Sequence, residues 1–212
     1  MPTILLATGN VAKQAKLRWL IEGLGFEAVT PRDLGLGGFD PAEDGVSHRD
    51  VAASKALAWA DAASCLAIAS DGGLDIPALG PNWNSLFTKR AAGDVPDDEA
   101  RADHLVGLMR GKSVPEREAF KREAVAVAAP GRVLGVWEAG GSVGRVVESY
   151  DPAKIKDGFW LPAVLWDTRF GKIVADLTPE ESEQTENGWN ELREVVRPFL
   201  ADLLSGAGVR AG

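Results

Sequence analysis

The sequence predicts an α/β protein built on a mixed β-sheet with flanking helices. Its first residues read as a strand, a turn and a helix in succession. A second apolar run, residues 66–70, leads straight into the segment Asp71-Gly72-Gly73. Residues 119–147 alternate between apolar and polar types and are punctuated by glycines, which is typical of antiparallel hairpins. Strand-and-helix succession together with hairpins favours a mixed sheet.

The first 30 residues predict two strands with a helix between them. Residues 3–7 form a short apolar run that Thr8-Gly9-Asn10 interrupts. Residues 11–24 have helical spacing of their apolar side chains, at Leu17, Leu20, Ile21 and Leu24. Residues 26–30 then resemble a second strand, which gives the order strand, helix, strand.

The next segment predicts a loop, a helix and a buried strand. Residues 33–45 are rich in glycine, proline and acidic residues, so we expect an irregular loop. Ser47 or Asp50 can begin the following helix, whose inner face carries Val51, Ala52, Lys55, Ala56 and Ala60. The strand 66–70 should end at Asp71, placing this carboxylate in a loop at the carboxyl end of a strand.

The second half predicts two helices and at least one more strand. Residues 97–109 form an amphipathic pattern with Ala100, Leu105, Leu108 and Met109 on one face. Residues 172–177 are a candidate last strand. Thr178 and Glu181 match a capping box, in which each residue's side chain binds the other's backbone N–H. A helix over 189–204 should close the domain, and residues 205–212 should form a frayed tail.

Composition excludes several classes of protein. With 212 residues, the chain is long enough for one sizeable domain. Its formal net charge of −8 argues against broad binding to nucleic acid backbones, which requires a basic face. No stretch approaches the roughly 20 apolar residues that cross a bilayer, and Met1-Pro2-Thr3-Ile4 does not resemble a secretory signal. We therefore expect a cytoplasmic protein with no membrane partner.

Cysteine and histidine are too rare to build a site of their own. The single cysteine, Cys65, has no internal disulfide partner and lies in an apolar stretch, so a small core residue is a better interpretation than a nucleophile. The two histidines, His48 and His104, are too few for a His-rich metal site. We interpret His104 as structural and His48 as a residue that begins a helix, with a cleft-lining position as the alternative.

The turn Thr8-Gly9-Asn10 is a candidate anion site. A Gly-Asn turn between a strand and a helix presents backbone N–H groups at the helix N-terminus, where an anion is favoured. Lys13, about one turn into the helix, can reach back to the same place. The alternative is an ordinary turn in which Asn10 only caps the helix.

Asp71 is a candidate metal ligand. Glycines beside a carboxylate, here Gly72 and Gly73, let a phosphate or metal approach the backbone closely. The acidic side chains of Glu43, Asp44 and Asp50 can supply further oxygen ligands, the donor type that Mg²⁺ prefers. The alternative is a solvated Asp-Gly turn among solvated loop carboxylates.

Four segments together resemble a known family. They are Ala7-Thr8-Gly9-Asn10-Val11-Ala12-Lys13, Asp50-Val51-Ala52-Ala53-Ser54-Lys55-Ala56, Ala69-Ser70-Asp71-Gly72-Gly73-Leu74, and Gly171-Lys172 with Asp176-Leu177-Thr178-Pro179-Glu180-Glu181. In order and spacing they resemble the inosine/xanthosine triphosphate pyrophosphatases, enzymes that remove non-standard purine nucleotides. The family has Glu-Asn-Ala-x-x-Lys-Ala at the second segment and Ala-Asp-Asp-Ser-Gly-Leu at the third.

The resemblance implies a role for each matching residue. Asp71 corresponds to the catalytic, metal-binding aspartate, and Glu43 falls where a second metal ligand is expected. Substrate-binding positions are implied for Thr8, Gly9, Asn10, Lys13, Lys55, Gly72 and Arg90. The registration of Arg90 is the least secure, because the preceding loop, residues 80–85, is altered.

The resemblance also implies the fold and the reaction. We expect one domain over residues 1–212 in which an elongated sheet and its helices form two lobes around a central cleft. Water would attack the α-phosphorus of a nucleoside triphosphate such as ITP, XTP or dITP, releasing a nucleoside monophosphate and pyrophosphate. Mg²⁺, or Mn²⁺ in its place, would be the cofactor, and a homodimer is the expected assembly.

The base-reading segments depart from the family. Where it has Phe-Gly-Tyr-Asp-Pro, this chain has Gly158-Phe159-Trp160-Leu161-Pro162, so Trp160 can stack on a base but the aspartate is replaced. The family's lysine and Ser-His-Arg after the capping box are replaced by Ser182 and Thr185-Glu186-Asn187. One hypothesis is that Glu186 and Asn187 read a different base edge. The alternative is that they are exposed helix-start residues and base reading is relaxed.

Three functions therefore compete. The first is a metal-dependent nucleoside triphosphate pyrophosphatase with altered base preference. The second is a catalytically weak nucleotide-binding or regulatory protein that keeps the fold and the phosphate site. The third is a septum-formation-type pyrophosphatase, which shares the fold but fits these motifs less well. The retained Lys13, Glu43, Lys55 and Asp71 favour the first.

Overall fold

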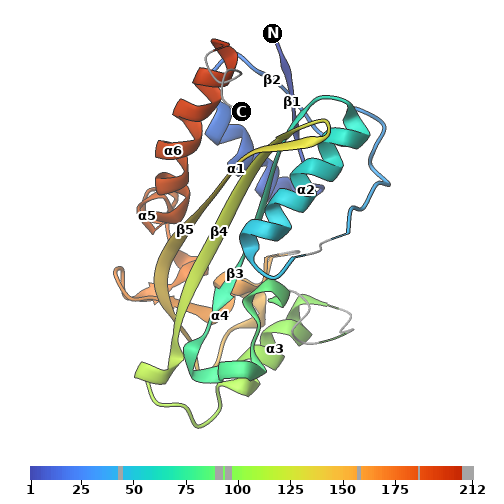
Figure 1. Cartoon of the computed structure of the whole chain (residues 1–212). Helices are drawn as coiled ribbons and strands as arrows, with labels where there is room; N and C mark the ends of the chain where they lie inside the picture. The colour runs from blue at the N-terminus through green and yellow to red at the C-terminus, as the bar shows by residue number, and fades with distance from the viewer. Residues whose placement is uncertain (43–44, 89–92, 94–96, 157–158, 186, 207–212) are drawn as a thin grey trace. The chain divides into compact units, whose positions relative to one another are not determined.

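The computed structural model describes residues 1–42, 45–88, 93, 97–156, 159–185 and 187–206. Its strands are β1 (Thr3–Leu6), β2 (Glu27–Val29), β3 (Leu66–Asp75), β4 (Glu118–Ala129), β5 (Arg132–Val146), β6 (Leu165–Asp167) and β7 (Lys172–Ile173). Its helices are α1 (Val11–Ile21), α2 (His48–Ala63), α3 (Asp98–Leu108), α4 (Leu161–Val164), α5 (Pro179–Thr185) and α6 (Asn187–Leu204). Figure 1 shows their order along the chain.

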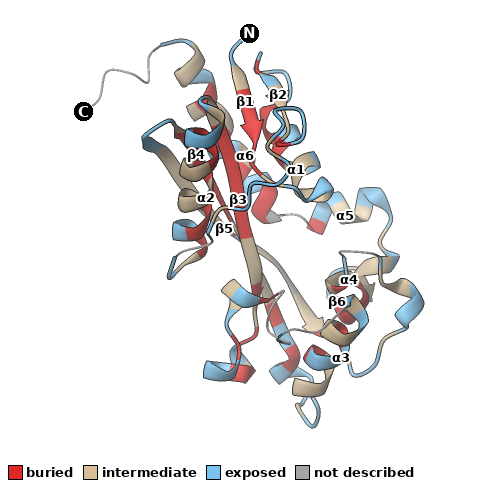
Figure 2. Cartoon of the chain, turned by 90° about the vertical axis from the view of Figure 1, so that its right-hand side faces the viewer, coloured by how far each residue is buried: buried red, intermediate tan, exposed pale blue. Residues whose placement is uncertain are grey.

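The described strands form one mixed sheet in the order β2-β1-β3-β4-β5-β6-β7. Strand β1 pairs in parallel with both β2 and β3, whereas β6 pairs antiparallel with β5 and β7. The fold is therefore a mixed α/β fold, as the sequence predicts. Figure 2 shows that β1 and the first half of β3 are buried, which is typical of parallel strands covered on both faces.

The chain divides into two compact units. Unit 1 consists of Met1–Gly72, Glu123–Ala139 and Gly188–Gly212, and unit 2 consists of Gly73–Arg122 and Gly140–Asn187. The expectation of one domain over residues 1–212 stays a prediction.

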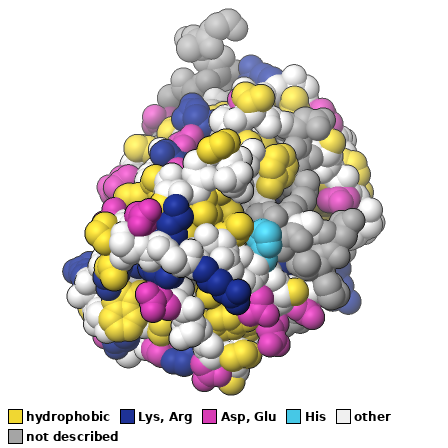
Figure 3. All heavy atoms as spheres, turned by 90° about the horizontal axis from the view of Figure 1, so that it is seen from below, with side chains coloured by type: hydrophobic (Ala, Val, Ile, Leu, Met, Phe, Trp, Pro, Cys, Tyr) yellow, Lys and Arg dark blue, Asp and Glu magenta, His cyan; other side chains and the backbone are white. Residues whose placement is uncertain are grey.

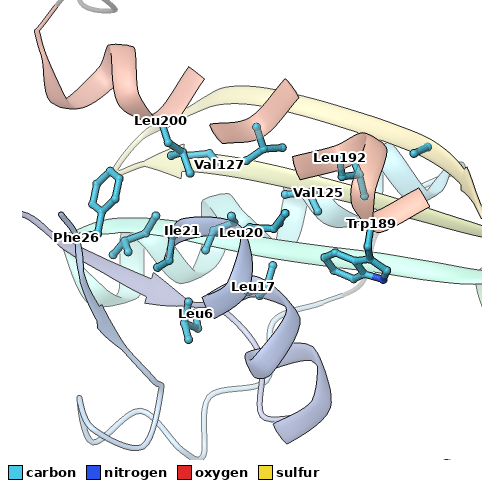
Figure 4. Close-up of a cluster of buried hydrophobic side chains, with 14 residues drawn as sticks. Leu6, Leu17, Leu20, Ile21, Phe26, Val125, Val127, Trp189, Leu192 and Leu200 are labelled. Carbon is cyan, nitrogen blue, oxygen red and sulfur yellow. The ribbon is translucent and has the colours of Figure 1, made fainter. Parts of the chain in front are cut away.

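Unit 1 has a core on each face of its strands. On one face, α1 and α6 cover the strands with large apolar side chains (Figure 4), including Leu6, Leu17, Leu20, Val125, Val127, Leu192 and Leu200. On the other face, α2 packs through mostly small side chains, namely Ala52, Ala56, Trp59 and Ala60 against Leu5, Ala7, Ala67 and Ala69. Neighbouring residues of a strand point to opposite faces, so Leu5 and Leu6 belong to different cores.

Unit 2 has its own core, built around α3, α4 and the ends of the long strands. Its buried residues include Leu74, Leu105, Met109, Val146, Trp160 and Leu165. Helix α5, which also belongs to unit 2, begins with the predicted capping box. Thr178 N–H donates to Glu181 Oε2 over 2.8 Å, and Glu181 N–H donates to Thr178 Oγ1 over 3.3 Å.

The largest correction concerns β3. The strand does not stop before Asp71 but continues to Asp75. Its extension is held in unit 2, where Leu74 N–H donates to Thr88 Oγ1 over 3.1 Å and the Trp83 indole donates to the Leu74 carbonyl over 2.5 Å. These partners are distant in sequence, so local turn propensity at the two glycines gives way to tertiary pairing.

Three smaller predictions were also wrong in part. Helix α1 ends at Ile21, not at residue 24, because the following Gly23 and Gly25 have positive φ angles of 74° and 91°. The segment 172–177 is a strand only over Lys172–Ile173. Most glycines of 119–147 lie inside β5 instead of at turns: an added Cβ at Gly135 would stand 2.2 Å from the Trp137 ring.

Some structural features agree with the predictions from the sequence, and others were not predicted. The described part of 33–45 contains neither helix nor strand, and α6 begins two residues earlier than predicted. Cys65 is half-buried against the core under α2, and burial raises the pKa of its thiol, which fits a packing role. The short elements α4 and β6 were not predicted. Of the predicted tail, residues 207–212 lie outside the described residues.

Candidate active site

Asn10 begins α1 as its N-cap. Its side-chain Oδ1 accepts from the N–H groups of Ala12 and Lys13 over 2.9 and 3.1 Å. Its own N–H donates to Thr8 Oγ1 over 3.1 Å, and Gln14 Nε2 donates to the Thr8 carbonyl over 2.8 Å. The alternative interpretation, in which the turn is an ordinary helix start capped by Asn10, therefore describes its geometry correctly.

The cap still leaves donors for an anion. In the part of the chain that the structure describes, the N–H groups of Gly9 and Val11 have no hydrogen-bond partner. The Asn10 side chain also keeps its Nδ2 amino group, because only Oδ1 serves the cap. These donors lie at the positive end of the α1 dipole, so the turn can cap a helix and bind a phosphate at the same time.

The turn forms part of a pocket of about 320 Å³ within unit 1. The pocket is lined by Ala7, Thr8, Gly9, Gly37, Gly38, Phe39, Asp40, Pro41, Lys55 and Trp59. One wall is aromatic, since Phe39 and Trp59 meet edge to face with ring centroids 4.8 Å apart. The other groups are backbone, a hydroxyl, a carboxylate and an ammonium group, a combination suited to a charged ligand.

Helix α2 supplies the charged groups beside Asp71. Ser47 caps the helix and accepts from Asp50 N–H, so Ser47 begins it and Asp50 lies in its first turn. His48 and Lys55 are seven residues apart on α2, about two turns, and therefore lie on one face. The alanine contact described above lets this face approach β3 closely.

Asp71 lies between His48 and Lys55. The Nδ1 atom of His48 is 2.6 Å from Asp71 Oδ2, and Nζ of Lys55 is 3.9 Å from Asp71 Oδ1. His48 is 4% exposed and Asp71 is 9% exposed, so the solvated-turn alternative for Asp71 is wrong. Asp71 itself is not among the residues that line the pocket, and Lys55 is the pocket residue that contacts its carboxylate.

These donors fit a magnesium ion only as a site shared with a substrate. Among the described residues, no group of three or more His, Cys, Asp or Glu side chains can hold a metal by itself. Mg²⁺, however, is commonly bound by one or two carboxylates, water and substrate phosphates. Asp71 supplies one carboxylate, and Asp40 supplies another at the pocket wall. The predicted ligand Glu43 lies outside the described residues, as does Asp44.

The remaining predicted residues either do not line the pocket or lie outside the described part of the chain. Arg90 and Glu186 lie outside the described residues. Lys13 is half-buried in the first turn of α1, Gly72 lies within β3, and Asn187 is the first residue of α6. Trp160 is 5% exposed in the core of unit 2, whereas the neighbouring Phe159 is 45% exposed.

Sequence reasoning missed several residues of the site, of which His48, Trp59 and Asp40 carry the most chemistry. His48 was interpreted as a helix start, which is correct, but its bond to Asp71 was not foreseen. Trp59 lies one helical turn after Lys55, so the spacing on α2 contained a signal for it. Asp40 had no signal that distinguished it from the other acidic residues of its loop.

A comparison with protein families identifies the chain. The model of the Ham1 family matches residues 4–189, which covers most of the sequence and includes the turn, α2 and Asp71. The chain belongs to the Ham1 family. It is 28% identical to a dITP/XTP pyrophosphatase of Halorhodospira halophila, over 94% of this chain and 98% of that protein. It is 35% identical to a dITP/XTP pyrophosphatase of Bradyrhizobium sp., over 81% of this chain and 80% of that protein.

Solved Ham1 structures share the fold. A HAM1 protein from Coxiella burnetii superposes with a TM-score of 0.75 at 22% identity, covering 98% of this chain and 100% of the other. The Staphylococcus aureus Ham1 protein gives a TM-score of 0.72 at 22% identity, covering 96% and 98%. At these identities the likeness concerns the fold alone.

The surface of this Ham1 protein carries charges of both signs. Figure 3 shows one face on which Lys and Arg side chains are interspersed with Asp and Glu, with no continuous basic area. Among the described residues, no helix is both long and apolar enough to cross a membrane.

Proposed function

We propose that this chain is a metal-dependent nucleoside triphosphate pyrophosphatase that acts on non-standard purine nucleotides such as ITP, XTP and dITP. The observation that supports it best is the position of Lys55, which lines the pocket with Thr8 and Gly9 and stands 3.9 Å from Asp71. Lys55 thus links a pocket suited to phosphate with a neighbouring carboxylate suited to metal or water. The names of the curated relatives support the choice of substrate.

The phosphates are held by the turn and by lysines. The N–H groups of Gly9 and Val11 and the Asn10 amino group donate to phosphate oxygens. Lys55 adds a positive charge from a nearly buried position, where screening by water is reduced. Lys13 reaches back from the first turn of α1 as a second cation.

Asp71 orients the attacking water. The water oxygen forms a bond to the α-phosphorus, the bond from that phosphorus to the bridging oxygen breaks, and pyrophosphate leaves. The proton of the water passes to the Asp71 carboxylate. A bound Mg²⁺ or Mn²⁺ ion, held by Asp71, by Asp40 or Glu43, and by the substrate phosphates, supplies neutralisation of the charge that develops on the phosphate oxygens.

Base recognition is where this chain departs from the family. Leu161 stands where the family has aspartate, and the proposed reader pair is Glu186 and Asn187. The exposure of Phe159 makes it a better stacking candidate than Trp160. A pocket that lacks directed hydrogen bonds to the base edge should discriminate weakly.

A second candidate is a nucleotide-binding protein with little turnover. It is favoured by Ser70 and Gly72, which replace an aspartate and a serine of the family motif and so reduce the oxygen ligands around Asp71. In this candidate the turn and Lys55 still bind the triphosphate, but no water is activated.

One survey separates these candidates. Purified protein is mixed with Mg²⁺ and each of ITP, XTP, dITP, ATP, GTP and a modified purine triphosphate, and pyrophosphate release is followed. The proposal expects the highest kcat/KM for a deaminated purine and loss of turnover in Asp71→Asn. Tight nucleotide binding without pyrophosphate release would establish the second candidate. An unchanged order of substrates in Glu186→Ala would exclude the reader role of that residue.

The proposal also includes the oligomeric state and the cellular location. We expect a homodimer that acts in the cytoplasm, and light scattering coupled to size exclusion measures the mass directly. A monomeric mass would contradict the first of these expectations.

A further inference from the structure

A buried histidine binds the carboxylate on which the proposed function depends. His48 is the first residue of α2, and its Nδ1 atom lies 2.6 Å from Asp71 Oδ2. An ionised carboxylate only accepts, so the imidazole Nδ1–H is the donor to it. Burying a polar ring and a carboxylate without a hydrogen bond between them would cost free energy. This hydrogen bond is therefore part of the buried interior of unit 1.

The two carboxylate oxygens have different surroundings. Oδ2 is occupied by His48, whereas Oδ1 faces the Lys55 ammonium group at 3.9 Å, beyond a direct hydrogen bond. Both partners come from the same face of one helix, and that helix packs on β3 through alanines. The carboxylate is therefore oriented by a single rigid element.

We propose that His48 is a positioning residue for Asp71, which holds Oδ2 and thereby presents Oδ1 to the metal and the attacking water. This inference rests on the proposed function. The torsion that turns an aspartate carboxylate is broad and has little preference of its own. The His48 bond would fix this torsion, and Oδ1 would remain the oxygen that could hold a metal or orient water.

We expect His48 to act through Asp71, because its ring is only 4% exposed and its Nδ1 atom is bound to Asp71 Oδ2. The expected consequence is a change in metal binding and in kcat, with little change in the KM for the nucleotide. A partner that orients a metal ligand typically changes metal affinity or activity by about tenfold to a hundredfold.

Substitutions at His48 separate a positioning bond from simple packing. His48→Asn keeps a nitrogen donor at the position of Nδ1, His48→Gln moves the donor one atom further out, and His48→Phe keeps a ring without a donor. The matched control is His104→Phe, because His104 is the other histidine and lies exposed on α3. Thermal unfolding of each variant reports whether the fold is kept.

Two readouts are compared for the full chain. The first is Mn²⁺ binding to the complex of the protein with a non-hydrolysable triphosphate analogue, followed by the electron paramagnetic resonance signal of the free ion. The second is kcat and KM for the best triphosphate at saturating Mg²⁺. We expect His48→Phe and His48→Gln to weaken Mn²⁺ binding and lower kcat by about tenfold or more. His48→Asn should remain within about threefold of the wild type in both, since its donor is kept.

Several outcomes would overturn the inference. One is a folded His48→Phe that binds Mn²⁺ and turns over substrate like the wild type. Another is a folded His48→Asn that loses as much as His48→Phe, because the bond would then not be the cause. Absence of Mn²⁺ binding by the wild type would overturn it as well. If His48→Phe does not fold, the difference between His48→Asn and His48→Gln decides in the same way.

The same data distinguish failure of the inference from failure of the proposed function. Wild-type protein that releases no pyrophosphate, but whose Mn²⁺ affinity falls in His48→Gln and not in His48→Asn, would contradict the pyrophosphatase proposal and keep the positioning role. A wild type that turns over triphosphates, but whose Mn²⁺ affinity and kcat do not change on substitution of His48, would keep the pyrophosphatase proposal and contradict the positioning role.

Discussion

Nζ of Lys55 lies 3.9 Å from Oδ1 of Asp71, and both side chains are nearly buried, with 13% and 12% of their surface exposed. At this distance the opposite charges attract without a direct hydrogen bond. A ligand that binds between them therefore does not have to break a direct hydrogen bond from Lys55 to Asp71. The relationship explains why a lysine and an aspartate from different elements can serve one pocket.

The first prediction concerns the charge of Lys55. Lys55→Met should raise the KM for a triphosphate by about tenfold to a hundredfold, because a hydrogen bond to a charged group contributes about 1.5–3 kcal/mol. Steady-state kinetics at fixed Mg²⁺ measure it. Lys16→Met, in α1, is the control and should leave the KM unchanged. Equal KM values for Lys55→Met and the wild type would remove Lys55 from the phosphate site.

The second prediction separates the two roles of Asn10. Asn10→Asp keeps the oxygen that accepts from Ala12 and Lys13, so α1 should remain capped and the unfolding free energy should hardly change. It removes the amino donor and adds a negative charge where phosphate binds, so kcat/KM should fall by about a hundredfold.

Asn10→Ala is the matched variant. It should lose about 1 kcal/mol of unfolding free energy with the cap, and urea unfolding measures this loss. If Asn10→Asp keeps full activity, Asn10 is a cap and nothing more.

The third prediction concerns the contact between α2 and β3. Ala56 is fully buried in the alanine contact, so Ala56→Leu should overpack it and lower the unfolding free energy by about 1–3 kcal/mol. Activity should fall as well, because a displaced α2 moves His48 and Lys55 away from Asp71. Ala62→Leu, on the exposed side of α2, is the control. Urea unfolding and kcat are measured for both variants. If the two variants have similar unfolding free energies, the contact between α2 and β3 can accommodate a larger side chain at Ala56.

The fourth prediction concerns pH and Glu181. Hydrogen bonds from Lys172 and then from Thr178 N–H hold the pKa of Glu181 below its ordinary value of 4.5. A carboxyl whose pKa is lowered by folding stabilises the fold above its unfolded pKa, and this contribution is lost as pH falls through the folded pKa.

Glu181→Gln should therefore unfold more easily than the wild type at pH 7, and the difference should shrink below pH 4.5. Thermal unfolding across this range measures it, with Glu191→Gln in α6 as the control. A difference that stays constant with pH would mean that Glu181 acts by packing alone.

Much of the fold followed from local sequence patterns. The capping box of Thr178 and Glu181, the N-cap at Ser47 and the strand-turn-helix around Asn10 are encoded within a few residues, so short-range chemistry specified them. The core face of α1 followed from the helical spacing of its apolar residues. The motif order also predicted the family, which the match over residues 4–189 confirmed.

Only the tertiary structure decided where the chemistry lies. The extension of β3 through Asp71 depends on partners such as Trp83 and Thr88, and the bond from His48 joins residues 23 positions apart. Neither contact leaves a local pattern, because each arises from the way α2 and the strands pack. The sequence by itself determined which groups are available, namely a cap, two lysines and an aspartate. Packing decided that one oxygen of that aspartate is bound to a histidine while the other faces a lysine.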